Sequence, residues 1–291
     1  ATIVLAGAVV AVWQLPGPAR GSGAPADAVL PSGQLPHSGP AVAPPGSVGA
    51  TQIIASSSPV GQSPAPVPTR SPASTAARPA QRTVVSVDTV GRGQGSDSTL
   101  SWTQQVSGAN RLLTAEVAVG AAPDTGCSLS VTDNGATMTR LTTVHDDNQP
   151  AGFHSVFYRV APPTGTNTIS ATVTGCAVDV LTGGSISFTG ASQSAPLGRA
   201  VTAAGDGTRA AATVAGTPSG AVAVGFVSAG TLVDSATTPS TDRFIENGDA
   251  STGAGNSGAA TQAGSGGSNT LAWSVEADWW AVTAVSVLPV S

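Results

Sequence analysis

A chain of 291 residues in which only 9% are charged cannot supply the charged outer faces that amphipathic surface helices need. Its 36 glycines and 22 prolines, with many small and β-branched residues, predict instead an all-β protein with Gly-rich turns. Residues 83–291 carry seven Arg and no Lys against fifteen carboxylates, a net charge of −8. This balance argues against a nucleic-acid partner, because neutralising phosphates requires clustered basic side chains.

Residues 1–13 form an uninterrupted segment of apolar and small side chains. A helix that spans a bilayer needs about 20 such residues, so thirteen are too few by themselves. Two interpretations stay open: the remnant of a membrane anchor, which we favour, and the hydrophobic region of a signal peptide. Either one predicts that the rest of the chain is extracytoplasmic, at the cell surface or secreted.

Residues 14–82 are expected to form a disordered linker rich in Pro, Ser, Ala and Gly. Fourteen of the 22 prolines fall in this segment. Such a composition buries too little apolar surface to offset the entropy of ordering, and it favours extended polyproline conformations. The linker is predicted to be a stalk that holds the following domain away from the membrane.

Strand signals recur from residue 83 to the end of the chain. Asn134-Gly135, between two apolar runs, predicts a tight hairpin over residues 127–141. Two alternating runs joined by a Pro-Pro-Thr-Gly turn predict a second hairpin over residues 153–174. Residues 247–269, rich in Gly, Ser, Ala and Asn, are expected to be an exposed loop or a ragged edge.

About a dozen short strands and no helix are therefore expected in residues 83–291. The sequence shows no convincing internal repeat. The predicted fold is one antiparallel two-sheet β-sandwich of jelly-roll type, large enough to fold around its own core.

The two cysteines, Cys127 and Cys176, each lie in a strand-like segment. In an exported chain this spacing and compartment favour a disulfide over two buried free thiols. A zinc site is not expected, because two cysteines without further ligands at zinc spacing do not complete one.

Five segments follow one another in a characteristic order: NRLLTAEVAVG from residue 110, SVTDNGATMTRL from 130, SVFYRVAPPTGTNTISATVTG from 155, ISFTGASQSAPLG from 186 and DWWAVTAVSVLPV from 278. Together they resemble a β-sandwich module that recurs in secreted and cell-surface proteins of actinobacteria and other bacteria. The resemblance implies an extracytoplasmic, usually non-catalytic module that is appended to anchors, enzymes or other sandwich domains. It brings no catalytic residues and does not predict the disulfide.

Two groups of polar residues are candidates for chemistry. His145, followed by Asp146-Asp147, precedes His154 by nine residues, and Asp133 would be their acidic neighbour in a metal or acid–base site. The alternative interpretation is a polar connection between strands. A separate group of oxygen ligands (Glu246, Asn247 and Asp249 around a glycine) would suit calcium, although the ligand set is incomplete.

Trp279 and Trp280 are candidates for stacking on a ligand. Adjacent residues of a strand point to opposite faces, so only one of the two rings can join the core. An exposed ring would stack on a sugar or contact a partner protein, and the alternative is a ring covered by a loop.

The sequence thus predicts a non-catalytic module that acts in adhesion, envelope architecture or assembly with surface proteins. The alternatives are a carbohydrate-binding module that uses an exposed Trp and a secreted hydrolase. The hydrolase needs a histidine within hydrogen-bond reach of a nucleophile or a carboxylate pair. No cofactor is expected, apart from the calcium considered above.

Overall fold

The structure, a computed structural model, describes residues 83–145, 151–248 and 255–291. The apolar segment 1–13, the linker 14–82 and three of the acidic candidates (Asp146, Asp147 and Asp249) lie outside the described residues. Every regular element in the described ranges is a β-strand, which confirms the all-β prediction. This part of the chain contains no helix that is long and apolar enough to cross a membrane.

Residues 86–189 form a first sandwich of two antiparallel sheets, with strand orders β1-β9-β3-β7-β6 and β2-β8-β4-β5. The strands are β1 Ser86–Gly95, β2 Thr99–Val106, β3 Leu112–Gly120, β4 Ser128–Asp133, β5 Ala136–Thr137, β6 Thr139–His145, β7 Gly152–Val160, β8 Gly165–Thr174 and β9 Val180–Thr189. This order is that of interlocked Greek keys, as in a jelly roll.

Residues 201–287 form a second sandwich, with strand orders β10-β17-β12-β15-β14 and β11-β16-β13. The strands are β10 Val201–Gly205, β11 Arg209–Val214, β12 Val222–Ala229, β13 Val233–Ala236, β14 Thr241–Asn247, β15 Asn256–Ala263, β16 Asn269–Val275 and β17 Trp280–Val287. Strands β10 to β13 take the places of β1 to β4, and β14 to β17 take the places of β6 to β9.

The prediction of one two-sheet sandwich without an internal repeat is therefore wrong. The described residues form four sheets, arranged as two sandwiches of the same topology. Equivalent strands share the alternation of inward and outward positions but few residue identities, which is why the sequence did not reveal the repeat. One of the few shared features is an Asn-Thr pair, at residues 167–168 in β8 and at residues 269–270 in β16.

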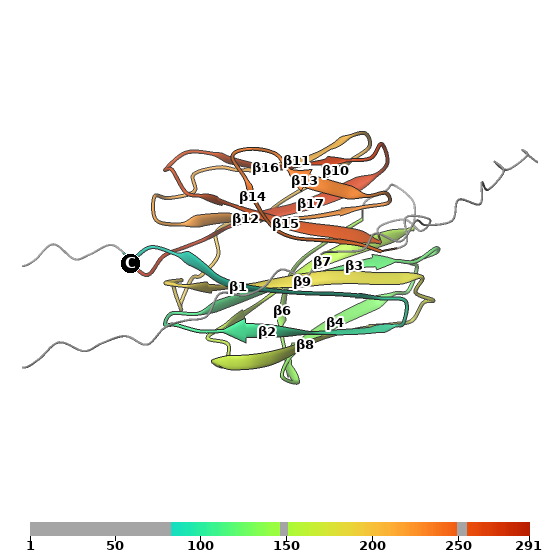
Figure 1. The fold of residues 1–291 in the computed structure, drawn as a ribbon, viewed down its shortest axis with the longest axis horizontal. Coiled ribbons are helices and arrows are strands. Elements are labelled where there is room, and N and C mark those ends of the chain that lie inside the picture. The colour runs from blue at the N-terminus through green and yellow to red at the C-terminus, as the bar shows by residue number, and fades with distance from the viewer. Residues whose placement is uncertain (1–82, 146–150, 249–254) are drawn as a thin grey trace, which may run out of the picture. The chain divides into compact units, whose positions relative to one another are not determined.

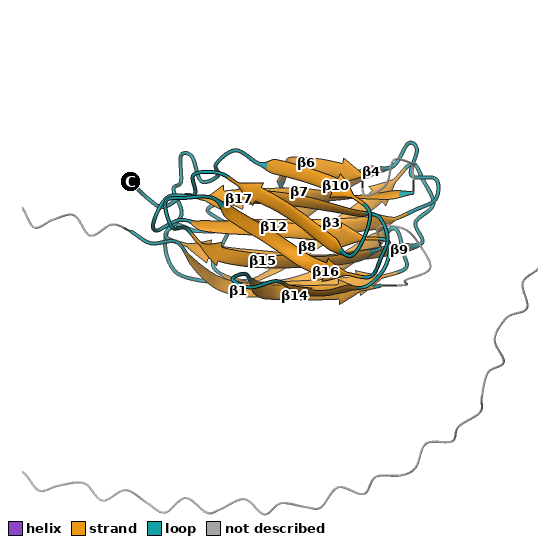
Figure 2. Ribbon diagram, turned by 90° about the horizontal axis from the view of Figure 1, so that it is seen from above, coloured by secondary structure: helices purple, strands orange, loops and turns teal. Residues whose placement is uncertain are grey.

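The four sheets stack as layers, with the two five-stranded sheets facing each other in the middle (Figure 1). Figure 2 shows the strands of successive layers lying over one another when the stack is seen from above. Three apolar clusters fill the spaces between the layers: one inside each sandwich and one between the two sandwiches.

Each contact between the two sandwiches is repeated by a second contact in which the equivalent strands are interchanged. Strand β9 packs against β14 as β17 packs against β6, and β3 packs against β15 as β12 packs against β7. The two sandwiches are therefore related by an approximate two-fold rotation, like the subunits of an isologous dimer.

The side chains on the two sides of this pseudo-dyad differ. On one side the ring of Phe244 lies over Gly184, where an added Cβ would come within 2.6 Å of the ring. On the other side the equivalent positions hold Thr283 and Thr142, whose hydroxyl oxygens are 3.0 Å apart. The contact between the sandwiches is thus apolar on one side of the pseudo-dyad and polar on the other, so the two packed surfaces are not chemically identical.

The hairpin predicted at residues 127–141 forms around its turn, where β4 pairs with β5 across Asn134 and Gly135, which both have positive φ (49° and 79°). Residues 139–141 belong instead to β6, in the opposite sheet. The hairpin predicted at residues 153–174 is wrong. Its two runs are β7 and β8, which belong to opposite sheets of the first sandwich. The segment with the two prolines carries the chain from one sheet to the other.

The expectation of an exposed loop over residues 247–269 is also wrong for its centre. Residues 256–263 form β15, which pairs with both β12 and β14 and is buried along most of its length. Ala259 lies between Phe226 and Phe244 in this sheet. The small side chains of β15 leave room for these large neighbours, so a composition typical of loops belongs here to an internal strand.

Candidate functional site

His145 ends strand β6 and contacts a residue that the sequence did not single out. Its Nδ1 is 2.9 Å from Asp124 Oδ2, and the imidazole is 53% exposed whereas the carboxylate is 3% exposed. The backbone N–H of Gly152 also donates to Asp124, at 3.2 Å. The buried carboxylate thus holds a ring that is about half exposed to solvent. Asp124, in the loop before β4, and His145, at the end of β6, are 21 positions apart, so no local pattern marks the pair.

This pair lines a surface pocket of about 270 Å³ beside the disulfide. Arg140 lies on the pocket wall, with its guanidinium 5.3 Å from the centre of the Phe157 ring, and donates to the carbonyl of Leu129. The wall also includes Thr143. Arginine, imidazole and hydroxyl groups at one opening are suited to hydrogen bonding with a polar or anionic group.

The disulfide between Cys127 and Cys176 is present, as predicted from spacing and compartment, with the two Cα atoms 4.9 Å apart. Each cysteine follows a glycine with positive φ, and a Cβ on Gly175 would lie 2.2 Å from the carbonyl oxygen of Gly126. Only glycine allows this close approach of the two backbones. The disulfide therefore fixes the loops that surround the Asp124–His145 pocket.

His154 points to the opposite face of its sheet, into the contact between the two sandwiches. Its Nε2 is 2.9 Å from Thr283 Oγ1, and its Nδ1 is 3.8 Å from Glu116 Oε1. The order hydroxyl, imidazole, carboxylate is that of a hydrolase triad. All three side chains are 0% exposed, however, so a substrate has no access to this hydroxyl.

Burial favours the uncharged forms of both titratable groups in this cluster. It raises the pKa of Glu116 well above its ordinary value, and Ser257 offsets this only in part. Within the described residues, neither Glu116 oxygen nor Ser257 Oγ makes a well-formed hydrogen bond. Burial also lowers the pKa of His154 to about 3. The cluster is therefore a neutral carboxylic acid beside a neutral imidazole.

This cluster predicts how the free energy of unfolding depends on pH. Above pH 4.5 the folded state retains the Glu116 proton that the unfolded state loses, so stability falls as pH rises. Between pH 6.5 and about 3 the unfolded state gains a His154 proton that the folded state does not, so stability falls as pH drops. The two effects oppose each other between pH 4.5 and 6.5, and stability should fall on both sides of that plateau.

Glu116→Gln should abolish the alkaline fall and leave the acid fall in place. Urea unfolding of the wild type and of this variant at intervals from pH 3.5 to 9 checks the prediction. If both proteins lose stability equally above pH 6.5, Glu116 is ionised in the folded state and the assignment is wrong.

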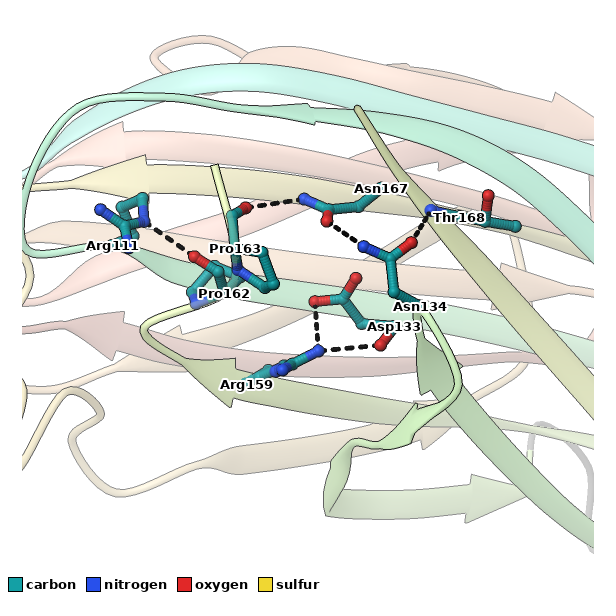
Figure 3. A network of polar contacts seen from close by, with 8 residues as sticks. All are labelled: Arg111, Asp133, Asn134, Arg159, Pro162, Pro163, Asn167 and Thr168. Carbon is teal, nitrogen blue, oxygen red and sulfur yellow. Dashed lines mark hydrogen bonds and ion pairs between the residues drawn. The ribbon is translucent and has the colours of Figure 1, made fainter. Parts of the chain in front are cut away.

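The structure does not bring Asp133 to the histidines. Asp133 and Arg159 form an ion pair, with Nη1 2.9 Å from Oδ2, and Arg159 also donates to the Asp133 carbonyl (Figure 3). Burial raises the pKa of Asp133, and Arg159 offsets this in part. Nearby, Asn134 and Asn167 hydrogen-bond to each other, and Asn167 donates to the Pro163 carbonyl. The candidate site of His145, His154 and Asp133 is therefore not assembled, since each of the three side chains has other partners.

The calcium candidates that the structure describes are engaged in other contacts. Glu246 Oε1 is 3.1 Å from Arg92 Nε. The Asn247 side chain accepts from the N–H of Val233 and donates to its carbonyl, which fixes the start of β13. In the described ranges no group of three or more His, Cys, Asp or Glu side chains is placed to hold a metal ion.

Trp279 and Trp280 differ in environment. Trp279 is 40% exposed and directly precedes β17. Trp280 is half-buried, and its ring lies over Gly205 of the neighbouring strand β10, where an added Cβ would be 2.8 Å away. Trp280 thus packs on the second sandwich, and Trp279 is the ring that can reach a ligand.

No protein-family model, no curated protein and no solved structure matches the chain.

Proposed function

We propose that this protein is a non-catalytic extracytoplasmic module, displayed on its Pro-rich segment, that acts in adhesion, envelope architecture or assembly with a surface protein. The observation that carries the proposal is that both sandwiches direct binding-competent groups to one end of the stack. These groups are the Asp124–His145 pocket on the first sandwich and the exposed Trp279 on the second.

The register of the strands places the two groups at the same end. In the first sandwich Gly120, Gly152 and Val180 are neighbours at the end of β3 and the starts of β7 and β9. In the second sandwich Ala229, Asn256 and Trp280 are neighbours at the same ends of β12, β15 and β17. The two ends adjoin, because a Cβ on Gly248, after β14, would lie 2.6 Å from the Val180 side chain. Loops at one end of a rigid β-scaffold are a common place for recognition.

The disulfide supports the extracytoplasmic part of the proposal, since disulfides form and persist mainly in oxidising compartments. The exposure of Trp279 favours carbohydrate as a second candidate class of partner, because a partly exposed indole can stack on a sugar ring.

Trp279→Ala is expected to weaken binding at least tenfold without changing stability. The purified chain is applied to an array of bacterial and host glycans and to isolated cell-envelope fractions, with intrinsic Trp fluorescence recorded alongside. Val84→Ala is the matched control, because Val84 is 59% exposed and precedes β1 at the other end of the strands. Equal binding by wild type and Trp279→Ala would contradict a role for this ring. If the wild type binds neither array nor fractions, the proposed function fails.

A further inference from the structure

The repeat allows each position of the second sandwich to be compared with its counterpart in the first. Gln104 of β2 pairs with Asn167, and Val214 of β11 pairs with the equivalent Asn269. In the same way Ala212 takes the place of Trp102. Two large side chains that point into the first sandwich are therefore replaced by small ones in the second.

In the first sandwich these two side chains close the space between the edge strands β1 and β2. The buried Gln104 carboxamide donates to Thr89 Oγ1 at 2.6 Å and accepts from Ser185 Oγ at 2.5 Å. Its Nε2 is also 3.3 Å from Ser187 Oγ, and the Trp102 indole donates to Ser185 at 2.8 Å. A planar amide surrounded by hydroxyls is thus what fills this position.

In the second sandwich the corresponding space, between β10 and β11, is a cavity of about 540 Å³. Val214 lines it in place of Gln104, and Ser286 lines it in place of Ser187. Ser286 Oγ, on the cavity wall, is 2.9 Å from the Oγ1 of the buried Thr217, and a hydroxyl that makes one hydrogen bond can still make another. The cavity is within the size range of small-molecule sites.

The remaining walls divide into polar and apolar parts. Thr202 and the exposed Arg199 supply donors on the β10 side. Pro218 and Leu288, with Val214, supply an apolar surface. A single amide group would fill only part of this volume. A ligand that combines an amide, a methyl group and several hydroxyls fits all of the walls.

We propose that this cavity binds the acetamido group of an N-acetylated amino sugar. The amide takes the place that the Gln104 carboxamide occupies in the first sandwich, next to Ser286. The methyl group packs on Val214 and Leu288, and the sugar hydroxyls face Thr202 and Arg199. The site lies towards the start of β10, whereas Trp280 pairs with Gly205 at its end, so the inference goes beyond the proposed function and is independent of Trp279.

The test is a titration of the ¹⁵N-labelled full chain with N-acetylglucosamine, followed by ¹H–¹⁵N chemical shifts. Saturable changes are expected at the amides of Val214, Ser286 and Leu288, and glucose, which has no acetamido group, should bind at least tenfold more weakly. Changes confined to the region of Trp279, equal binding of glucose, or no binding would each overturn the inference. The first of these results would still agree with the proposed function.

Val214→Gln tests the same idea by restoring the side chain of the first sandwich. This variant should bind N-acetylglucosamine at least tenfold more weakly than the wild type. Ala211→Gln, on the outward face of the same strand, is the matched control and should bind as the wild type does. Unchanged binding by a folded Val214→Gln variant would contradict the proposal. If that variant does not fold, the ¹H–¹⁵N chemical-shift changes of the wild type still test whether the cavity binds the sugar.

Discussion

Phe244→Ala is expected to lower the free energy of unfolding by about 3–5 kcal/mol, the usual cost of removing a buried aromatic ring. Phe244 is 3% exposed and belongs to the cluster that joins the two sandwiches. Its ring lies over Gly184, which has no side chain that could fill the space that the ring would leave. Chemical unfolding at fixed pH measures the loss.

A double-mutant cycle attributes this loss to the contact with Gly184. Gly184→Ala alone should cost about 1–3 kcal/mol, because its Cβ would overlap the ring. In the Phe244→Ala background the same substitution should cost little or nothing. Additive effects would show that the ring does not pack on this glycine.

Thr142→Ala, at the equivalent position across the pseudo-dyad, serves as the control. It removes one hydrogen bond to Thr283, which keeps its contact with His154, so the expected loss is only about 0.5–1.5 kcal/mol. The contrast between the two substitutions would show that the apolar side of the contact contributes more to holding the sandwiches together than the polar side.

Breaking the disulfide is expected to lower the free energy of unfolding by about 4 kcal/mol. Cys127 and Cys176 are 49 positions apart, and closing a loop of that length restricts the unfolded chain by this amount in the chain-entropy model. The Cα separation of 4.9 Å lies within the ordinary range, so the folded state accommodates the bond. Guanidinium unfolding with and without a reducing agent measures the difference.

The variant with both cysteines changed to serine is the control for this experiment. It should show the lowered stability without reductant and no further loss when reductant is added. A difference below about 1 kcal/mol between the oxidised and reduced wild type would contradict the prediction and would place the two loops close together in the unfolded chain as well.

The sequence by itself determined the features that depend on neighbouring residues. Period-two alternation specified strands, and Asn134-Gly135 specified a tight turn because both positions tolerate positive φ. Composition favoured an all-β protein, and the spacing and compartment of Cys127 and Cys176 favoured their bond. The conclusions on strands, turn and fold class rest on local conformational preference. The disulfide follows because the chain has only two cysteines that could pair.

Only the tertiary structure decided which strands pair and which faces meet. The runs on either side of the two prolines look like a hairpin, yet they lie in opposite sheets, where β7 pairs with β3 and β6 and β8 pairs with β2 and β4. Strand β15 looked like a loop because of its small residues. They are needed there because Ala259 lies between Phe226 of β12 and Phe244 of β14 in the same sheet.

The candidate sites depend on the same long-range pairing. Asp124 meets His145, and His154 meets both Glu116 and, from the other sandwich, Thr283, through contacts that span up to 129 residues of chain. The cavity between β10 and β11 is lined by Val214, which takes the place of Gln104 at the equivalent position of a repeat. A linear pattern cannot express this comparison, since the equivalence is one of strand position in the fold and not of residue identity.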